Sequence, residues 1–178
     1  MVNKRPLYIA DIEKNGTDKV LGLSFVKNPA TGYNFKIVER NEKGTLIFAP
    51  ILVANTPIFR NNEKYGEHNV LFLPDVITDI MANTMSHQIR FDVEHDEQPI
   101  TEIEWISSFQ IDYKNKTFFN NYPLPDGSWV GMLNIVKNDL QAEIWRKNIN
   151  GISISGIFSY HRVGLSEAIE MYNKLRIK

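Results

Sequence analysis

The sequence predicts an α+β fold in which most strands are antiparallel and a few helices flank them. Two observations support this prediction: the apolar residues lie mainly in short runs of strand length, and turn-forming residues separate these runs. A third observation is that helical spacing of apolar residues is confined to three segments. At 178 residues the chain is long enough for one domain with a hydrophobic core, so residues 1–178 are expected to form a single domain.

Composition and charge exclude several classes of function. The 20 Lys and Arg residues and the 21 Asp and Glu residues give a net charge of -1, so neither nucleic acid nor an anionic membrane is expected as the main partner. The chain has no cysteine, which rules out disulfides, iron–sulfur clusters, thiolate zinc sites and a cysteine nucleophile. No run approaches the roughly 18 apolar residues of a membrane span, and the N-terminus has no signal-peptide core. A cytosolic protein is the simplest interpretation.

The first half of the chain is predicted to be rich in strands. Residues 7–12 and 21–26 are expected to pair with each other, because the turn-like segment EKNGTDK separates them. The polar segment 61–69 is predicted to be a loop in which His68 is solvated. Further strands are predicted at residues 33–39, 46–54, 57–60 and 70–73.

The second half combines helices with further strands. Asp75 is expected to cap the first helix, and Asn138 with Gln141 forms a capping-box pattern at the start of the second. The apolar residues of both helices keep the spacing of one buried face. Helices are predicted at residues 75–85, 138–150 and 166–175, and strands at residues 89–95, 103–111, 128–136 and 151–161.

One segment, GISISGIF at residues 151–158, places two serines one residue apart in a predicted strand. Alternation puts Ser153 and Ser155 on one face of this strand, whereas Ile152 and Ile154 share the other face. The apolar face is expected to pack on the core, and this would leave the hydroxyl face free.

A second segment, RFDVEHDEQPI at residues 90–100, carries the histidine best placed to act on these serines. Alternation points His95 inward at the end of a strand and puts Asp92 on the opposite, solvated face. His161 is excluded as a direct partner, because it lies eight residues after Ser153. That separation is roughly 26 Å along a strand that rises about 3.3 Å per residue.

The two segments together indicate a serine–histidine hydrolase. A serine hydroxyl becomes a nucleophile when a neighbouring base removes its proton, and histidine is the usual base. His95 would be the base, and Ser153 or Ser155 the nucleophile. The same pattern also fits a small-residue strand and a core histidine that serve only in packing. A metal site at residues 94–97 is less favoured, since consecutive strand residues point to opposite faces.

Five blocks of the sequence, in order along the chain, carry a family resemblance. They are LGLSFVKNPATGYNF (21–35), APILVANTPIFR (49–60), VEHDEQPI (93–100), PDGSWVGMLNIV (125–136) and EIWRKNINGISISGIF (143–158). This series resembles the tailed-phage prohead proteases, which are serine proteases of capsid maturation that share the herpesvirus assemblin fold. The resemblance covers about residues 7–160. It implies an assemblin-like fold with a mostly antiparallel, β-barrel-like core.

The resemblance also implies which residues form the active site. The family's histidine, which is followed by Asp and then by Pro-Ile, falls on His95. The family's nucleophile lies in a Gly-x-Ser-x-x-Gly block and falls on Ser153, between Gly151 and Gly156. Ser155 occupies a position that is commonly acidic or glycine in the family, and it is the alternative nucleophile.

Three alternatives exist for the third catalytic residue. In many relatives the acid that supports the histidine comes from a strand after the serine. The segment of this chain that most resembles that strand, LGLSFVKNPA, instead precedes the histidine, so the order of the segments resembles a permuted subgroup of the family. The position expected to hold the acid is Gly22. Asp18 is the nearest acid upstream, and Glu167 is the nearest acid after the serine strand. The remaining alternative is a dyad with no third residue.

The function implied by the resemblance is that of a serine endopeptidase of phage prohead maturation. Its substrates would be the scaffold and major capsid proteins and the protease itself, inside the assembling procapsid in the host cytoplasm. No metal or cofactor is implied, and a homo-oligomer is compatible with this function. The alternative is a catalytically degenerate relative that acts as an internal scaffold or capsid-assembly protein, which an incomplete site at Gly22 would favour.

Overall fold

The computed structural model describes residues 5–12, 19–86, 89–112, 124–136, 138–164, 166–167 and 170. Within these residues the fold is α+β, as predicted, and six of the eight strand pairs are antiparallel. The described strands form three open sheets. The closed, barrel-like core expected from the family resemblance is therefore wrong for the described part of the chain.

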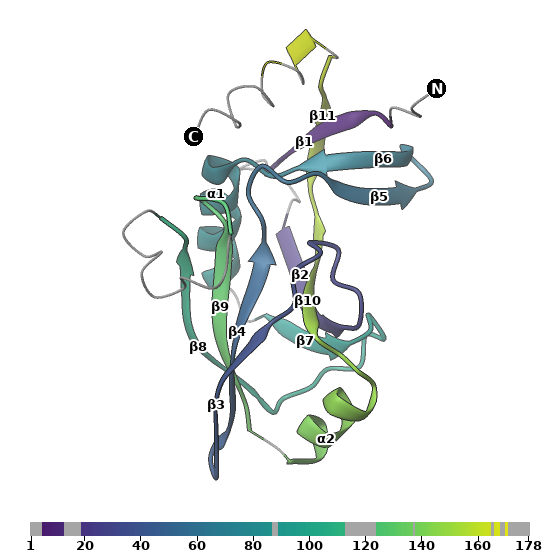
Figure 1. Ribbon diagram of the computed structural model, residues 1–178. Coiled ribbons are helices and arrows are strands. Elements are labelled where there is room, and N and C mark those ends of the chain that lie inside the picture. The colour runs from purple at the N-terminus through teal and green to yellow at the C-terminus, as the bar shows by residue number, and fades with distance from the viewer. Residues whose placement is uncertain are drawn as a thin grey trace.

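The three sheets each combine strands from distant parts of the sequence (Figure 1). The first has the order β11-β1-β6-β5 and contains β1 (Leu7–Asp11), β5 (Ile58–Asn62), β6 (Gly66–Leu71) and β11 (Ser159–Arg162). The second has the order β10-β2-β7 and contains β2 (Lys19–Val26), β7 (Arg90–Val93) and β10 (Gly151–Ile157). The third has the order β3-β4-β9-β8 and contains β3 (Lys36–Asn41), β4 (Gly44–Leu52), β8 (Ile103–Gln110) and β9 (Trp129–Ile135). In Figure 1 the first sheet lies at the top, above the other two.

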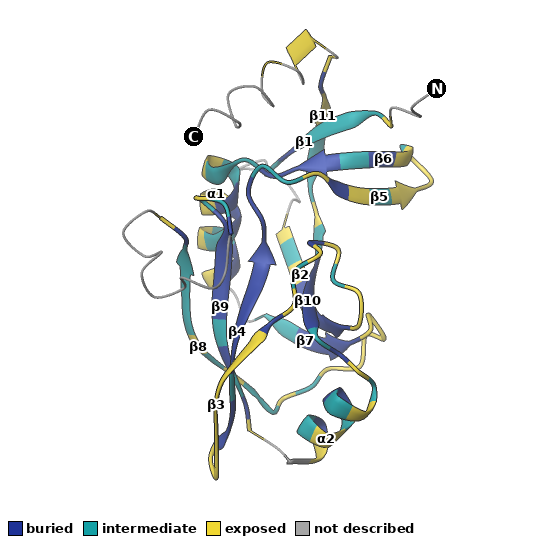
Figure 2. Ribbon diagram, viewed as in Figure 1, coloured by how far each residue is buried: buried dark blue, intermediate teal, exposed yellow. Residues whose placement is uncertain are grey.

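The main hydrophobic core joins the second and third sheets. Leu23 and Ile152 of the second sheet are fully buried in the same cluster as Ile47 and Leu133 of the third. Full burial of a side chain of this size is worth about 1.5–3 kcal/mol. Figure 2 shows β4 and β9 mostly in dark blue, whereas β3 is yellow. One face of the second sheet is thus fixed to the core, and its other face carries the polar residues considered below.

The first two predicted helices are present as α1 (Pro74–Met85) and α2 (Asn138–Arg146). Leu73 is the N-cap of α1 and makes no side-chain cap hydrogen bond, so the prediction that Asp75 caps this helix is wrong. Proline in the first turn fixes the backbone angle that the helix needs, and Asp75 in that turn interacts favourably with the helix dipole. α2 ends four residues earlier than residue 150. α1 packs against β2 and β9.

The start of α2 and the third predicted helix fall partly outside the described residues. The capping box involves Asn138, whose side chain is not among them. Gln141 donates from Nε2 to the Ile135 carbonyl at 2.8 Å and accepts from the Thr45 hydroxyl at 2.9 Å, so it ties α2 to the third sheet. Of the helix predicted at residues 166–175, the structure describes three residues, all of them helical.

Three predictions about the first half of the chain are wrong: the pairing of residues 7–12 with 21–26, the loop at residues 61–69 and the solvated His68. β1 and β2 do not pair with each other, since β1 lies between β6 and β11 and β2 lies between β7 and β10. The polar segment 61–69 contains most of the β5–β6 hairpin, and it is not a loop. His68 on β6 is fully buried, because the rings of Tyr8, Tyr65 and Tyr160 surround its imidazole at centroid distances of 5.3, 5.5 and 6.0 Å.

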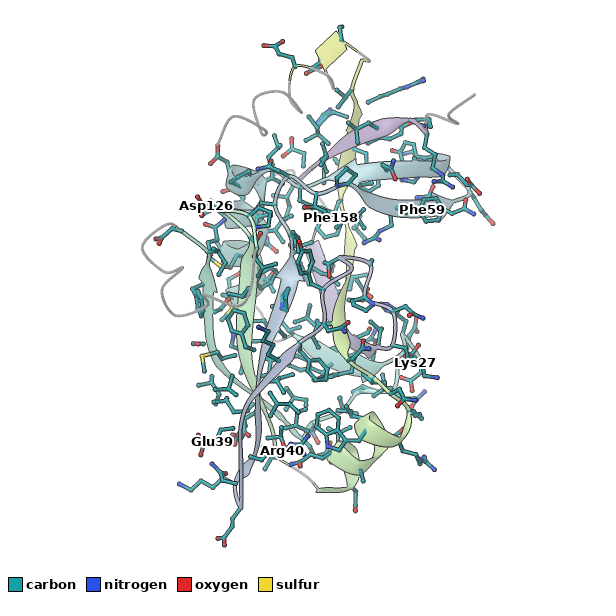
Figure 3. The ribbon with its side chains drawn as sticks, in the orientation of Figure 1. Lys27, Glu39, Arg40, Phe59, Asp126 and Phe158 are labelled. Atoms are coloured by element: carbon teal, nitrogen blue, oxygen red, sulfur yellow. The ribbon has the colours of Figure 1, made fainter. Side chains whose placement is uncertain are left out.

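The predicted serine strand, residues 151–161, is divided between β10 and β11. The register of β10 against β2 shifts between Ser155 and Gly156, and Phe158 lies outside both strands. Figure 3 shows Phe158 at the junction between the first sheet and the rest of the molecule, where its ring packs edge-on against Phe72 with centroids 5.6 Å apart. β11 then pairs with β1 in the first sheet. The two serines therefore belong to the second sheet with the rest of β10, and residues 159–162 belong to the first sheet.

Candidate active site

A row of polar side chains crosses all three strands of the second sheet. Ser153 on β10 pairs with Ser24 on β2, and Ser24 pairs with Asp92 on β7. Directly paired residues in neighbouring strands point to the same face of a sheet, so two hydroxyls and one carboxylate lie side by side. We call Ser153, Ser24 and Asp92 the polar row. Alternation turns the intervening apolar residues of these strands, such as Leu23 and Ile152, into the core.

Asp92 is buried, with an exposed fraction of 2%, and the prediction that it is solvated is wrong. The hydroxyl of Ser24, which is itself fully buried, donates a hydrogen bond to Oδ1 of Asp92. Nη2 of Arg90 lies 3.6 Å from Oδ2 of the same carboxylate. A buried carboxylate costs free energy unless hydrogen bonds and an opposite charge compensate for the lost water. Ser24 supplies the hydrogen bond and Arg90 supplies the charge.

A sharp turn after β7 brings His95 toward the polar row. Glu94 and His95 have φ angles of 54° and 58°, in the left-handed region that non-glycine residues rarely adopt. The N–H of Glu94 donates to the Phe25 carbonyl at 2.9 Å, and the N–H of Asp96 donates to the Val93 carbonyl at 3.1 Å. Since the strand ends at Val93, strand alternation does not extend to His95. The predicted inward orientation of this histidine is wrong, and its side chain is exposed.

This turn stores backbone strain next to the polar row. A non-glycine residue in the left-handed region costs on the order of 1–3 kcal/mol and persists only where surrounding contacts fix it. One such contact is the bond from the Lys27 N–H to Oε1 of Glu94, at 2.7 Å. Strained residues of this kind cluster at functional sites, so the observed geometry motivates a functional hypothesis for His95.

His95 contacts two serines through a single ring nitrogen. Its Nδ1 lies 2.8 Å from Oγ of Ser24 and 3.0 Å from Oγ of Ser155. Ser155 is half-buried at the end of β10 where the register shifts, and it pairs with Gly22 on β2. Asp92, Ser24, His95 and Ser155 therefore form one continuous chain of polar contacts.

Ser153, the predicted nucleophile, belongs to the polar row and has an exposed fraction of 8%. Among the hydrogen bonds between described residues, none joins Ser153 to His95, whereas the alternative nucleophile Ser155 does contact it. The strand register explains this arrangement, because it pairs Ser153 with Ser24, whose hydroxyl already meets both Asp92 and His95. The assignment of Ser153 as nucleophile stays a prediction.

The number of hydrogens in this chain of contacts limits its chemistry. Ser24 has one hydroxyl hydrogen and gives it to Asp92, so its oxygen can only accept from Nδ1 of His95. A neutral imidazole with its hydrogen on the other ring nitrogen leaves Nδ1 free to accept the hydrogen of Ser155. Once Nδ1 holds that proton, it can donate to Ser24. The Ser24–Asp92 pair is thus arranged to receive a hydrogen bond from His95 after proton transfer.

The predicted positions for a third catalytic residue have different outcomes. Asp18 lies outside the described residues. Glu167 is exposed, and no hydrogen bond between described residues joins it to His95. Gly22 pairs with Arg90 on β7, and a Cβ built on this glycine would lie 3.0 Å from the Arg90 carbonyl oxygen. A carboxylate side chain at position 22 would therefore crowd the neighbouring strand.

Ser24 and Asp92 are members of this site that sequence reasoning missed. Both lie in segments that the sequence analysis selected, Ser24 in LGLSFV and Asp92 three residues before His95. What joins them is the parallel pairing of β2 with β7, and the contact spans 68 residues of sequence. The available signal was that each of these polar residues stands between two apolar residues of its strand, Ser24 between Leu23 and Phe25 and Asp92 between Phe91 and Val93.

Two further features concern cofactors and membranes. Among the described residues, no group of three or more His, Cys, Asp or Glu side chains is arranged to hold a metal ion. In the same part of the chain, none of the helices has the length and apolar character needed to cross a membrane.

Comparison with known proteins adds no relative. No family model matches the chain, and no curated protein or solved structure matches it.

Proposed function

We propose that this protein is a serine hydrolase in which His95 is the general base and Ser155 is the nucleophile. The observation that carries the proposal is the 3.0 Å separation between Nδ1 of His95 and Oγ of Ser155. This distance lies within the roughly 2.6–3.2 Å that proton transfer to a general base requires. Exposure of His95 and half-burial of Ser155 leave both groups open to a substrate.

The proposed reaction is acyl transfer from a peptide to Ser155. Nδ1 of His95 removes the hydroxyl proton while Oγ attacks the carbonyl carbon, and the electron pair of the C=O double bond moves to oxygen. Collapse of this intermediate breaks the C–N bond, and the leaving amine takes the proton from Nδ1. Water then attacks the ester carbonyl while Nδ1 of His95 accepts one of its protons. Collapse of this second intermediate breaks the bond between the carbonyl carbon and Oγ, and Oγ of Ser155 takes the proton from Nδ1.

Ser24 and Asp92 act as positioning residues in this proposal. Neither residue needs to contact the substrate. Asp92 acts on Ser24, Ser24 contacts His95, and His95 contacts the reacting Ser155. Their effect depends on the protonation of the imidazole, since Ser24 can accept a hydrogen bond from Nδ1 only when Nδ1 carries hydrogen. An interaction that strengthens as the proton is transferred lowers the barrier of the reaction, whereas uniform binding does not. The arrangement differs from a conventional triad, in which the acid binds the ring nitrogen opposite the base, because Ser24 contacts the same nitrogen of His95 that faces Ser155.

The biological setting that the sequence blocks favour is prohead maturation in a tailed phage. We propose an assemblin-like arrangement of the strands, with scaffold and major capsid proteins, and the protease itself, as substrates. Cleavage would occur in the assembling procapsid within the host cytoplasm. The nucleophile differs from the one implied by the block pattern, since Ser155 replaces Ser153.

The second candidate function is that of a degenerate relative acting as an internal scaffold or capsid-assembly protein. One observation favours it: Nδ1 of His95 is shared between Ser24 and Ser155. A nitrogen that donates to Ser24 in the resting protein cannot accept the hydrogen of Ser155 at the same time. In that state the hydroxyl of Ser155 is not activated.

Labelling with a fluorophosphonate probe separates these candidates. Wild type, Ser155→Ala and Ser153→Ala are treated under identical conditions, and the modified residue is located by mass spectrometry of peptides. We expect labelling of wild type and of Ser153→Ala, and none of Ser155→Ala. Labelling that vanishes in Ser153→Ala and persists in Ser155→Ala would instead assign the nucleophile to Ser153. Folded protein with neither labelling nor self-cleavage in any form would favour the scaffold function.

A further inference from the structure

A pocket of about 500 Å³ opens beside β7. This volume falls within the range of about 300–1,000 Å³ that is common for small-ligand sites. The pocket lies between the end of α1, β7, the segment that follows β7, and the start of β8. Its apolar walls include Met85, Ile89, Phe91, Pro99, Ile103 and Trp105. None of the described residues that line it is acidic, and its charged member is Arg90.

Two residues that line this pocket, Arg90 and Trp105, each have a buried donor with no acceptor among the described residues. Nε of Arg90 and Nε1 of Trp105 are buried atoms without a hydrogen-bond partner among the described residues. Neither group can accept a hydrogen bond, because arginine and tryptophan side chains only donate. A buried donor that lacks an acceptor costs free energy. Both atoms are covered by protein, so in this conformation a ligand would reach the outer guanidinium nitrogens of Arg90 and the ring of Trp105, not these two atoms.

The guanidinium of Arg90 is only loosely held. Its 3.6 Å contact with Asp92 is longer than the roughly 2.7–3.2 Å of an N–H···O hydrogen bond. The side chain is 38% exposed, so its outer nitrogens are open to solvent. Arginine presents a planar fork that can bind a carboxylate at two points. A small rotation would let Arg90 meet a carboxylate in the pocket while one nitrogen still faces Asp92.

We propose that this pocket binds an apolar group that ends in a carboxylate. Arg90 would pair with the carboxylate through its outer guanidinium nitrogens, and the apolar walls, which include the Trp105 ring, would hold the body of the ligand. This chemistry is shared by the C-terminal residue of a peptide with a large apolar side chain and by a free aryl or alkyl carboxylic acid. The inference goes beyond the proposed hydrolase function, because binding requires neither Ser155 nor His95.

The tryptophan indole signals in a ¹H–¹⁵N NMR spectrum provide the test. The chain has three tryptophans. The signal of Trp105 is assigned with Trp105→Phe, and Trp129, which donates to Oγ of Ser108 at 2.6 Å, is the internal control. N-acetyl-phenylalanine is titrated beside N-acetyl-phenylalaninamide, which has the same body without the charge. We expect the acid to shift the Trp105 signal far more than the Trp129 signal, and the amide to bind about tenfold or more weakly.

Two variants test the roles of the pocket residues. Arg90→Gln retains a donor near Asp92 but removes the charge, and it is expected to abolish the preference for the acid over the amide. Thr101→Tyr places a large ring at an exposed position of the lining, so it is expected to fold and to weaken both ligands. Wild-type spectra provide the check that each variant is folded.

These binding measurements test the proposal without any measurement of catalytic activity. Equal affinities of acid and amide, an unmoved Trp105 signal, or unchanged binding to Thr101→Tyr would each overturn it. A further titration compares 3-phenylpropionate with a tetrapeptide that ends in phenylalanine. Tighter binding of the tetrapeptide would identify the ligand as a peptide C-terminus, and tighter binding of 3-phenylpropionate would identify it as a free carboxylic acid. The same titration on Ser155→Ala protein separates this result from the proposed hydrolase function, because pocket binding is expected to persist there.

Discussion

Oγ of Ser24 lies 2.8 Å from Nδ1 of His95, and the same hydroxyl donates its hydrogen to Asp92. The serine thus stands between a buried carboxylate and an exposed imidazole that are three residues apart in the sequence. This arrangement makes Ser24 one of the two serines that hold the imidazole of His95 in its orientation. The first two predictions concern this contact.

Replacing Ser24 with threonine and with valine isolates the effect of the hydroxyl. Both residues add a similar volume at this fully buried position, and only threonine keeps an oxygen for Nδ1 and for Asp92. A hydrogen bond to a charged group is worth about 1.5–3 kcal/mol, so we expect Ser24→Val to react with a fluorophosphonate about 10 to 100 times more slowly than Ser24→Thr. The measurement is the labelling rate at limiting probe. Equal rates in the two variants would contradict the role assigned to Ser24.

Ser24 and Asp92 are expected to act as a unit. Ser24→Ala removes the bridge, and Asp92→Asn keeps the shape of the side chain while removing its charge. If the carboxylate affects His95 only through Ser24, the double variant should label no more slowly than the slower single variant. Independent contributions would instead multiply, and a double-mutant cycle on labelling rates distinguishes the two results. Thermal unfolding of each variant provides the control for loss of structure.

The sequence predicts the local elements of this protein better than their partners. Short apolar runs locate β1, β2, β4, β7, β9 and β10, because strand alternation and turn residues are local signals. The partner of each strand is not a local property. β2 pairs with β7 and β10, far away in the chain, although the turn-like segment before it suggested a hairpin with β1. The barrel-like core expected from the family resemblance was wrong for the same reason, because it too depends on which distant strands pair.

The candidate site shows the same division. His95 and the two serines of β10 could be selected from residue type and position alone. Two local departures from strand geometry then decide which of them meet: the left-handed turn at Glu94 and His95, and the register shift after Ser155. The turn at Glu94 and His95 contains no glycine that would mark it, whereas Gly156 stands at the register shift, and a glycine within a strand often marks a bulge. The burial of Asp92 likewise depends on Ser24, which strand pairing brings to it, and on Arg90, which lies two residues before it on the same strand.

A carboxylate introduced at position 22 tests whether the site lacks an acid that it could accept. A Cβ at Gly22 would approach the Arg90 carbonyl oxygen to 3.0 Å, which is closer than ordinary van der Waals contact. Overpacking of this kind typically costs about 1–3 kcal/mol, so we expect Gly22→Glu to lower the free energy of unfolding by that amount and not to raise the labelling rate. Urea unfolding measures the first effect and probe labelling the second.

The neighbouring position supplies the control for this change. Leu21 is 45% exposed, and Leu21→Glu adds the same charge without crowding the strand. Surface substitutions usually change stability by no more than about 0.5 kcal/mol, and we expect that result here. Faster labelling of Gly22→Glu than of wild type would show that position 22 can hold a functional acid, and would support a degenerate site in the natural chain.

The last prediction concerns the tyrosine cluster of the first sheet and its dependence on pH. Burial raises the pKa of Tyr160 above its ordinary value of 10.0, and the charge of Arg60 opposes part of this shift. The folded protein therefore holds the phenol proton more tightly than the unfolded chain. The stabilisation is fully present below pH 10 and is lost as pH rises from there through the pKa of the folded state. One such proton contributes a slope of up to about 1.4 kcal/mol per pH unit.

Tyr160→Phe removes this titration while keeping the ring that packs against His68 and Tyr65. We expect the free energy of unfolding of this variant to fall less steeply above pH 10 than that of wild type. Urea unfolding at a series of pH values on both sides of 10 measures this difference. Tyr33→Phe, which removes a half-buried phenol from a different part of the chain, is the control for the other tyrosines. Parallel pH profiles for wild type and Tyr160→Phe would show that burial of this phenol does not couple its ionisation to folding.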